Sequence, residues 1–338
     1  MILNHADPEV FGAAGMLGVT VFFTLSGYLI TGLLLRDLAT DGRVHYSRFF
    51  LARALRLLPP LLLVMLGYVV VEGIFDHAGG RSLVPDTLLT GLTYTMNLPF
   101  MPHGSGSMYH LWTLATEEQF YLIWPLVLAW AWRRADPGAR GPALRRVIVI
   151  GIAAALLACL ATMAYQWPDT ARIYALPTSW ASALLIGCGL RIGRDRALAV
   201  LPRTVRTRCV LGTILVMGLL AGSVLPAQGG YPWTYLLTLP LIALGSGVLV
   251  LLADTAAPTL GAHPLIRVLA ALGLVSYAAY LWNLPIQIWI GDPQNLAGGV
   301  LGAGLTLIAA TASWWLVERP MQRLRRRITT PSPSPVPG

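Results

Sequence analysis

The sequence predicts an all-α fold: a polytopic transmembrane helical bundle. Only 12% of its 338 residues are charged and 56% are hydrophobic, whereas a soluble domain carries about 25% charged residues. The apolar residues gather in segments of about twenty, the length that an α-helix needs to cross a bilayer. Unbroken segments of this kind argue against a transmembrane β-barrel, whose strands alternate polar and apolar residues. The composition also excludes a disordered protein, a disulfide-stabilised domain and a coiled coil.

Ten apolar segments follow one another along the chain. They are residues 11–35, 58–76, 85–101, 110–132, 147–165, 173–190, 209–226, 234–253, 268–290 and 297–317. The segment 85–101 has a weak apolar core between Pro85, Asp86, Asn97 and Pro99. We therefore expect it to lie at the outer face of the membrane or to re-enter it, and not to cross it.

Arginine clusters set the orientation of the segments. The clusters lie at residues 36–56, 133–146, 191–208 and 319–327. Short arginine-rich loops stay in the cytoplasm, and all four clusters fall on that side only if segment 85–101 does not cross. The sequence therefore predicts nine crossings in a plasma-membrane protein with a cytoplasmic C-terminus. Nine crossings would place Met1 outside, so we expect a further helix before it, missing from this chain, which would make ten.

Residues 1–328 are expected to form one membrane domain, followed by a disordered Pro/Ser-rich tail at 329–338. The net charge of +9 does not indicate nucleic acid binding, because the arginines lie in loops where they set membrane topology. The three cysteines, Cys159, Cys188 and Cys209, show no metal-ligand spacing. We expect no metal site.

Ionisable residues inside a membrane segment usually mark function. His110 and Glu117 are seven residues apart, which places them on one helix face if the segment is helical from its start. Such a pair is suited to acid–base or orienting work, or it is a structural bridge to loop arginines. Glu72 lies near the outer end of its segment, where we expect it to reach water.

Two further faces are polar. Ser276, Tyr280 and Asn283 follow a helical repeat and either contact substrate or bond to a neighbouring helix. Residues Thr20, Thr24, Gly27 and Thr31 share another face, which is typical of close helix packing.

Arg53 and Arg56 are three residues apart at the cytoplasmic start of a segment. If the stretch is helical they share a face, and guanidinium groups suit phosphate oxygens. Topology signalling or lipid headgroup binding explains the same spacing equally well.

Five motifs in order resemble those of acyltransferase family 3, integral membrane O-acyltransferases of polysaccharides and macrolides. The motifs are Gly18–Thr31 (G-V-x-x-F-F-x-x-S-G-Y-L-I-T), Phe50–Pro59 (F-x-x-R-x-x-R-L-x-P), His110–Pro125 (H-x-W-T-L-A-x-E-E-Q-F-Y-x-x-W-P), Ser276–Pro285 (S-Y-x-x-Y-L-W-N-x-P) and Glu318–Pro320 (E-R-P). His5 resembles the histidine that the family carries in its first helix, while the basic residue expected upstream of it would lie before Met1. Asn283 stands where many members have histidine.

The resemblance implies transfer of a short acyl group, such as acetyl, from acyl-coenzyme A to a hydroxyl of a carbohydrate or macrolide acceptor. It implies His5 as general base or acyl carrier, with Glu117 and His110 as further catalytic groups. It assigns the coenzyme phosphates to Arg53 and Arg56. Substrate contacts are expected at Trp112, Gln119, Tyr121, Tyr280 and Asn283. No permanently bound cofactor is expected.

Two other classes remain open on the residues alone. A transporter or flippase for a sugar or a lipid-linked substrate would suit a helical bundle with an intramembrane acid, although no internal symmetry between two halves is visible. A non-catalytic membrane scaffold would leave the arginine spacing and the His110–Glu117 face without a purpose.

Overall fold

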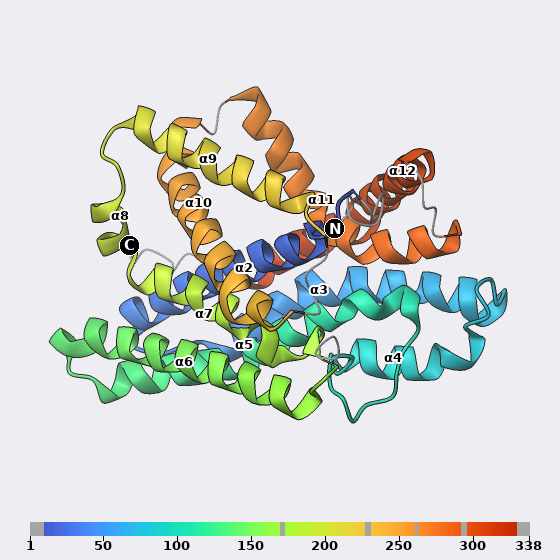
Figure 1. The fold of residues 1–338 in the computed structure, drawn as a ribbon, viewed down its shortest axis with the longest axis horizontal. Coiled ribbons are helices and arrows are strands. Elements are labelled where there is room, and N and C mark those ends of the chain that lie inside the picture. Colours follow the sequence, from blue (N-terminus) through green and yellow to red (C-terminus); the bar gives the residue numbers. More distant parts are fainter. Residues whose placement is uncertain (1–9, 170–172, 227–230, 261–262, 292–295, 330–338) are drawn as a thin grey trace, which may run out of the picture.

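The computed structural model describes residues 10–169, 173–226, 231–260, 263–291 and 296–329, and all regular structure within these ranges is helical (Figure 1). The N-terminal half contains α2 (Ala14–Asp41), α3 (Tyr46–Tyr68), α4 (Val84–Leu92), α5 (Trp112–Arg134) and α6 (Arg140–Gln166). The C-terminal half contains α7 (Pro177–Ile192), α8 (Arg194–Val200), α9 (Val205–Ser223), α10 (Leu239–Leu260), α11 (Pro264–Trp289), α12 (Leu296–Ser313) and α13 (Arg319–Thr329). The prediction of an all-α bundle is confirmed. His5 and residues 330–338 of the predicted tail lie outside the described residues.

Short helices of other types interrupt or precede these elements. Three π-helical turns, Val69–Ile74, Thr234–Thr238 and Trp314–Glu318, adjoin α3, α10 and α13. The 3₁₀ turn Gly106–Leu111 leads directly into α5. π-helical turns often occur at functional positions because they redirect side chains, and two of these three contain a glutamate, Glu72 and Glu318.

Within the described ranges, seven helices are long and apolar enough to cross a membrane. They are Ala14–Asp41, Tyr46–Ile74, Pro137–Gln166, Val205–Ser223, Thr234–Ala256, Ile266–Trp289 and Ala297–Leu324. As predicted, segment 85–101 is not a crossing: α4 has nine residues, about 14 Å of helix against a hydrocarbon core of about 30 Å.

Seven of the nine predicted crossings coincide with these helices, judged by length and composition within the described residues. The two predicted crossings outside the set of seven are α5, which contains two glutamates, and α7, which has 16 residues. Much of α7 is buried between α2, α6 and α10. Helices enclosed by other helices need less apolar length than helices that face lipid, which fits the buried position of α7. α5 is buried over its first turns, at Trp112–Glu117, but its outer face exposes Leu122, Ile123, Leu126 and Trp130.

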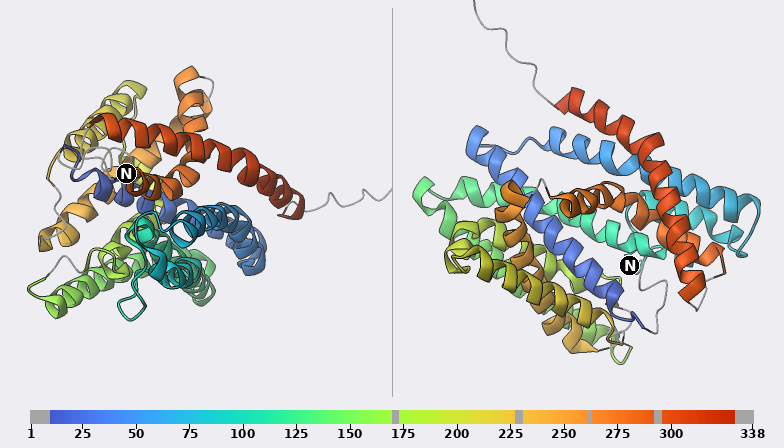
Figure 2. Two further views of the ribbon diagram at one scale, coloured as in Figure 1. Left: turned by 90° about the vertical axis from the view of Figure 1, so that its right-hand side faces the viewer. Right: turned by 90° about the horizontal axis from the view of Figure 1, so that it is seen from above.

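The helix ends that carry arginine gather at one end of the molecule. In Figure 1 the end of α2, the connection between α5 and α6, and α8 lie toward the left, whereas α4 and α12 lie toward the right. We call the left side the arginine-rich end. Figure 2 shows α12 and α13 as one long helical stretch that passes α3, and α13 packs against α3.

The tightest helix crossing joins α2 to α7. A Cβ atom on Gly27 would lie 2.0 Å from the carbonyl oxygen of Leu184, and one on Gly187 would lie 2.0 Å from the carbonyl oxygen of Thr24. The hydroxyls of Thr20 and Thr24 bond within α2 to the carbonyls four residues earlier. The close-packing face predicted for this segment is therefore confirmed, because small residues let two backbones approach.

Candidate active site

A buried ion pair links α3 to α5. Arg53 Nη2 donates to Glu118 Oε1 at 2.5 Å, and the two side chains are only 17% and 18% exposed. The guanidinium of Arg53 also lies over the ring of Tyr121, 3.6 Å from its centroid. Glu118 and Tyr121 are three residues apart and therefore neighbours on α5. The cation thus sits between an anion and an aromatic face.

One donor of this buried cation is unused. Arg53 Nε is buried and has no hydrogen-bond partner among the described residues. A buried N–H normally has a partner, because an unsatisfied donor costs about 1–3 kcal/mol. The Nε donor is therefore suited to an oxygen atom that arrives with a substrate.

Glu117, next to the ion pair, faces α2. Its Oε1 accepts hydrogen bonds from the hydroxyls of Ser26 and Tyr121, and those two hydroxyls also contact each other. Tyr121 is one helical turn after Glu117, so both side chains lie on the same face of α5. The carboxylate is 5% exposed. The Glu117 carboxylate thus has two hydroxyl donors. One of them, Tyr121, also contacts the Arg53 guanidinium through its ring.

His110 and Glu117, predicted to share a face, meet different helices. His110 precedes α5, in the 3₁₀ turn Gly106–Leu111. Its imidazole packs edge-on against the Tyr280 ring of α11, with the ring centroids 5.1 Å apart. Glu117 instead contacts Ser26 of α2. The predicted pairing of these two side chains stays a prediction.

The polar residues predicted on α11 serve different neighbours. The hydroxyl of Tyr280 donates to the carbonyl oxygen of His110 and contacts the hydroxyl of Thr113. Asn283 Nδ2 donates to Thr306 of α12 at 3.4 Å, and Ser276 bonds to Gly273 of its own helix. For Tyr280 and Asn283 these contacts favour interhelical bonding, the alternative that the sequence left open.

Gln119 fixes the loop that follows α4. Its side-chain amide and that of Asn97 exchange hydrogen bonds of 2.9 and 3.1 Å, and Gln119 Nε2 also donates to the Tyr94 carbonyl at 3.0 Å. Tyr94 has φ of +54°, an uncommon conformation for a residue with a side chain. Burial raises the pKa of its phenol, and the nearby Glu118 charge raises it further. Gln119 thus connects this strained turn to the helix that carries the charged cluster.

Trp112 belongs to an aromatic cluster beside the charged residues. Its ring lies 6.4 Å from Phe23, 5.2 Å from Tyr174 and 5.2 Å from Trp180, measured between centroids. The indole is 2% exposed. Its predicted role in substrate binding remains untested, and its observed contacts are packing contacts.

Arg56, the second predicted phosphate ligand, stands apart from Arg53. It is exposed, and its positive charge acts on the Glu318 carboxylate. Arg53 is largely buried and paired with Glu118 of α5. The two arginines are therefore not equivalent: only Arg56 is open to a ligand from the solvent at the arginine-rich end.

Glu72 was expected to reach water, and this expectation is wrong. The side chain is 1% exposed and accepts hydrogen bonds from Trp289 Nε1 at 2.9 Å and from the backbone N–H of Ala78 at 3.2 Å. The π-helical turn Val69–Ile74 and the turn after it enclose the carboxylate. A position near the end of an apolar segment gives no signal for such a turn.

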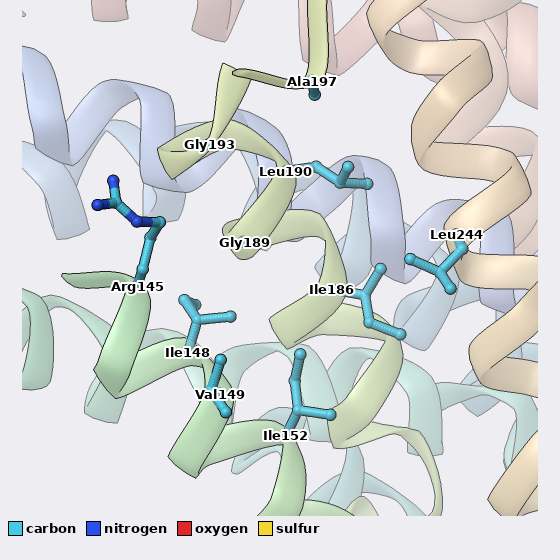
Figure 3. A pocket seen from close by; sticks show the side chains of 10 residues that line it. All are labelled: Arg145, Ile148, Val149, Ile152, Ile186, Gly189, Leu190, Gly193, Ala197 and Leu244. Carbon is cyan, nitrogen blue, oxygen red and sulfur yellow. The ribbon is translucent and has the colours of Figure 1, made fainter. Parts of the chain in front are cut away.

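An apolar groove elsewhere on the bundle does not resemble a reaction site. It has a volume of about 290 Å³ and is lined by residues of α6, α7, α8 and α10. Figure 3 shows that the only charged side chain in its lining is Arg145. A groove without an acid or a base cannot move protons, so the Glu117 cluster remains the candidate active site. Within the described residues no group of His, Cys, Asp or Glu could hold a metal ion.

Comparison with known families finds a match over nearly the whole chain. Residues 2–319 match the family described as Acyltransferase domain. The chain belongs to this acyltransferase family. It is 28% identical over 331 residues to the peptidoglycan O-acetyltransferase OatA of Listeria monocytogenes. The aligned region covers 91% of this chain and 51% of that protein.

A second member of the acyltransferase family is similar over almost the whole chain. The O-acetyltransferase OatA of Staphylococcus aureus is 23% identical over 343 residues, covering 96% of this chain and 55% of that protein. The chain thus spans about half the length of the curated relatives it matches. No solved structure matches it significantly.

Proposed function

We propose that this acyltransferase moves a short acyl group from acyl-coenzyme A to a hydroxyl of a carbohydrate, within the plasma membrane. The observation that carries the proposal is the buried cluster of Ser26, Arg53, Glu117, Glu118 and Tyr121. Three motifs far apart in the sequence meet there inside a helical membrane bundle. Ionisable groups in such a place are costly and are usually kept for function. In this proposal the arginine-rich end faces the cytoplasm, and the chain ends on that side of the membrane.

The cluster is suited to acyl transfer in two ways. Arg53 Nε can donate to the thioester carbonyl, where negative charge develops during attack. The acceptor hydroxyl forms the new C–O bond, the C–S bond breaks, and the hydroxyl proton passes through a base to the departing sulfur. We assign the base to His5, which lies outside the described residues, and we assign to Glu117 the orientation of that base.

The name of the Listeria relative, a peptidoglycan O-acetyltransferase, favours a polysaccharide acceptor over a macrolide. Trp112, Gln119, Tyr121, Tyr280 and Asn283 remain the proposed substrate contacts, with His110 as a further catalytic residue. Gln119, Tyr121 and Tyr280 also hold the site together through the contacts described above.

The test uses the purified chain in nanodiscs with radiolabelled acetyl-coenzyme A. Peptidoglycan fragments, a lipid-linked disaccharide and a macrolide are offered as separate acceptors, and O-acetyl ester formation is measured. The proposal expects ester on a carbohydrate and none without acceptor. A protein that moves a lipid-linked sugar between leaflets of proteoliposomes without forming ester is a transporter, and that result would overturn the proposal.

A further inference from the structure

A second pocket lies where the π-helical turn Trp314–Glu318 and α13 meet α11. Its volume is about 300 Å³, and it is lined by Leu274, Trp314, Arg319, Gln322 and Arg323. The helical stretch Ala297–Leu324 ends here, so the pocket is at the arginine-rich end. The pocket thus combines the apolar side chains of Leu274 and Trp314 with two guanidinium groups.

The two arginines of this pocket have no acidic partner among the residues that the structure describes. Within the described part of the chain, neither Arg319 nor Arg323 forms an ion pair. Arg319 is held over the ring of Trp315, 4.2 Å from its centroid, and is half-buried. Arg323 is one turn later on the same face. A stacked guanidinium loses little freedom when it binds an anion, because its plane is already fixed.

Arg53 and Arg56 of the neighbouring helix α3 differ in what their charges already contact. Arg53 is taken by Glu118, so its charge is already neutralised before any ligand binds. Arg56 is exposed and lies close enough to Glu318 to act on its charge. Because Glu318 directly precedes Arg319, Arg56 and the pocket border the same part of α13, which packs on α3.

We propose that this pocket binds the phosphate groups of acyl-coenzyme A through Arg319 and Arg323. The indole of Trp314 offers a flat surface on which an adenine ring can stack, and the amide of Gln322 can both donate and accept hydrogen bonds. Guanidinium forks are the strongest phosphate ligands among side chains. This inference rests on the proposed function, and it moves the main phosphate contacts from Arg53 and Arg56 to α13. A phospholipid headgroup presents the same chemistry, so the experiment must separate the two.

The test measures binding of coenzyme A, dephospho-coenzyme A and pantetheine to the full chain in phosphatidylcholine nanodiscs by calorimetry. The variant R319A/R323A is compared with R133A/R134A. The control removes the same charge from the end of α5, where Arg134 also stacks on a tryptophan, 5.8 Å from the Trp130 ring. We expect R319A/R323A to weaken coenzyme A binding about tenfold or more, to leave pantetheine binding unchanged, and the control to bind like the wild type.

A variant R319K/R323K keeps the charge but not the fork, so intermediate affinity would support the pocket even if the alanine variant folds poorly. Equal losses in R319A/R323A and the control would show a nonspecific charge effect and overturn the proposal. The proposal would also be overturned if, in nanodiscs that contain phosphatidylglycerol, R319A/R323A lost binding of that lipid but still bound coenzyme A like the wild type. If the wild type transfers acyl groups from acyl-coenzyme A while R319A/R323A keeps the same KM, the pocket fails but the function stands. If the wild type neither binds nor uses acyl-coenzyme A, the proposed function itself fails.

Discussion

Gly27 of α2 and Gly187 of α7 face each other's helix so closely that neither position has room for a side chain. Added Cβ atoms would lie 2.0 Å from the carbonyl oxygens of Leu184 and Thr24. Both oxygens belong to helix backbone, which cannot turn away as a flexible side chain does. We expect Gly27→Ala to push the helices apart and to cost about 1–3 kcal/mol of the free energy of unfolding.

Thermal unfolding of the purified variant in detergent checks this prediction. Gly218→Ala in α9 is the matched control, since nothing lies within 4 Å of its added Cβ. Alanine favours helix over glycine by about 1 kcal/mol, so the control should be as stable as the wild type or slightly more stable. Equal unfolding temperatures for the two variants would show that the α2–α7 contact is looser than the structure indicates.

The Arg53–Glu118 pair predicts an asymmetric stability pattern. Removing one partner leaves an uncompensated buried charge, which costs about 3–5 kcal/mol. Arg53→Met and Glu118→Leu should each destabilise strongly, while the double variant should be more stable than the sum of the two effects requires. A double-mutant cycle of unfolding free energies measures this coupling. Strictly additive single effects would contradict a direct interaction.

The sequence predicts most helices well because long apolar segments mark them, whereas α5 carries two glutamates and α7 has only 16 residues. It also predicts the packing face of α2, since Thr20, Thr24 and Gly27 repeat with the helical period. The same reasoning could not find the partner of Arg53, because Glu118 is 65 residues away and single-sequence spacing shows only neighbours on one helix. It mistook Glu72 for a water-exposed group, because nothing in the residue pattern marks the π-helical turn that buries it.

The family resemblance assigned the coenzyme phosphates to Arg53 and Arg56 together, whereas their spacing alone left lipid binding or topology signalling equally open. Their spacing does put both on α3, but helix packing decides what each one meets. α5 supplies Glu118 to Arg53, and α13 supplies Glu318 to the neighbourhood of Arg56. The spacing of Arg319 and Arg323 gave no sign of a pocket, because the structure alone places Trp314 and Leu274 beside them.

The hydrogen bonds of Gln119 stabilise the loop after α4, so their removal should make this loop open more often. Gln119→Leu removes its hydrogen bonds to Asn97 and to the Tyr94 carbonyl, and it leaves a left-handed turn at Tyr94 without support. Amide hydrogen exchange around residues 93–104 should become faster by about tenfold, the effect of one net hydrogen bond of roughly 1.4 kcal/mol. Exchange in α9 serves as the internal control and should not change. Unchanged exchange in the loop would mean that other contacts hold it.

Replacing Glu117 with glutamine should reduce acyl transfer without unfolding the protein. Glu117→Gln is close in size, keeps an oxygen that accepts from Ser26 and Tyr121, and removes only the negative charge. If the carboxylate orients the base and offsets its positive charge, kcat with acetyl-coenzyme A should fall about 10²- to 10⁴-fold. KM for the donor should stay within about twofold, because the variant leaves the phosphate contacts on α13 untouched. Asp195→Asn removes a carboxylate that is 98% exposed and should leave both constants unchanged. A Glu117→Gln protein with wild-type kcat would remove this carboxylate from the mechanism and leave Ser26, Tyr121 and Glu117 as a structural bridge between α2 and α5.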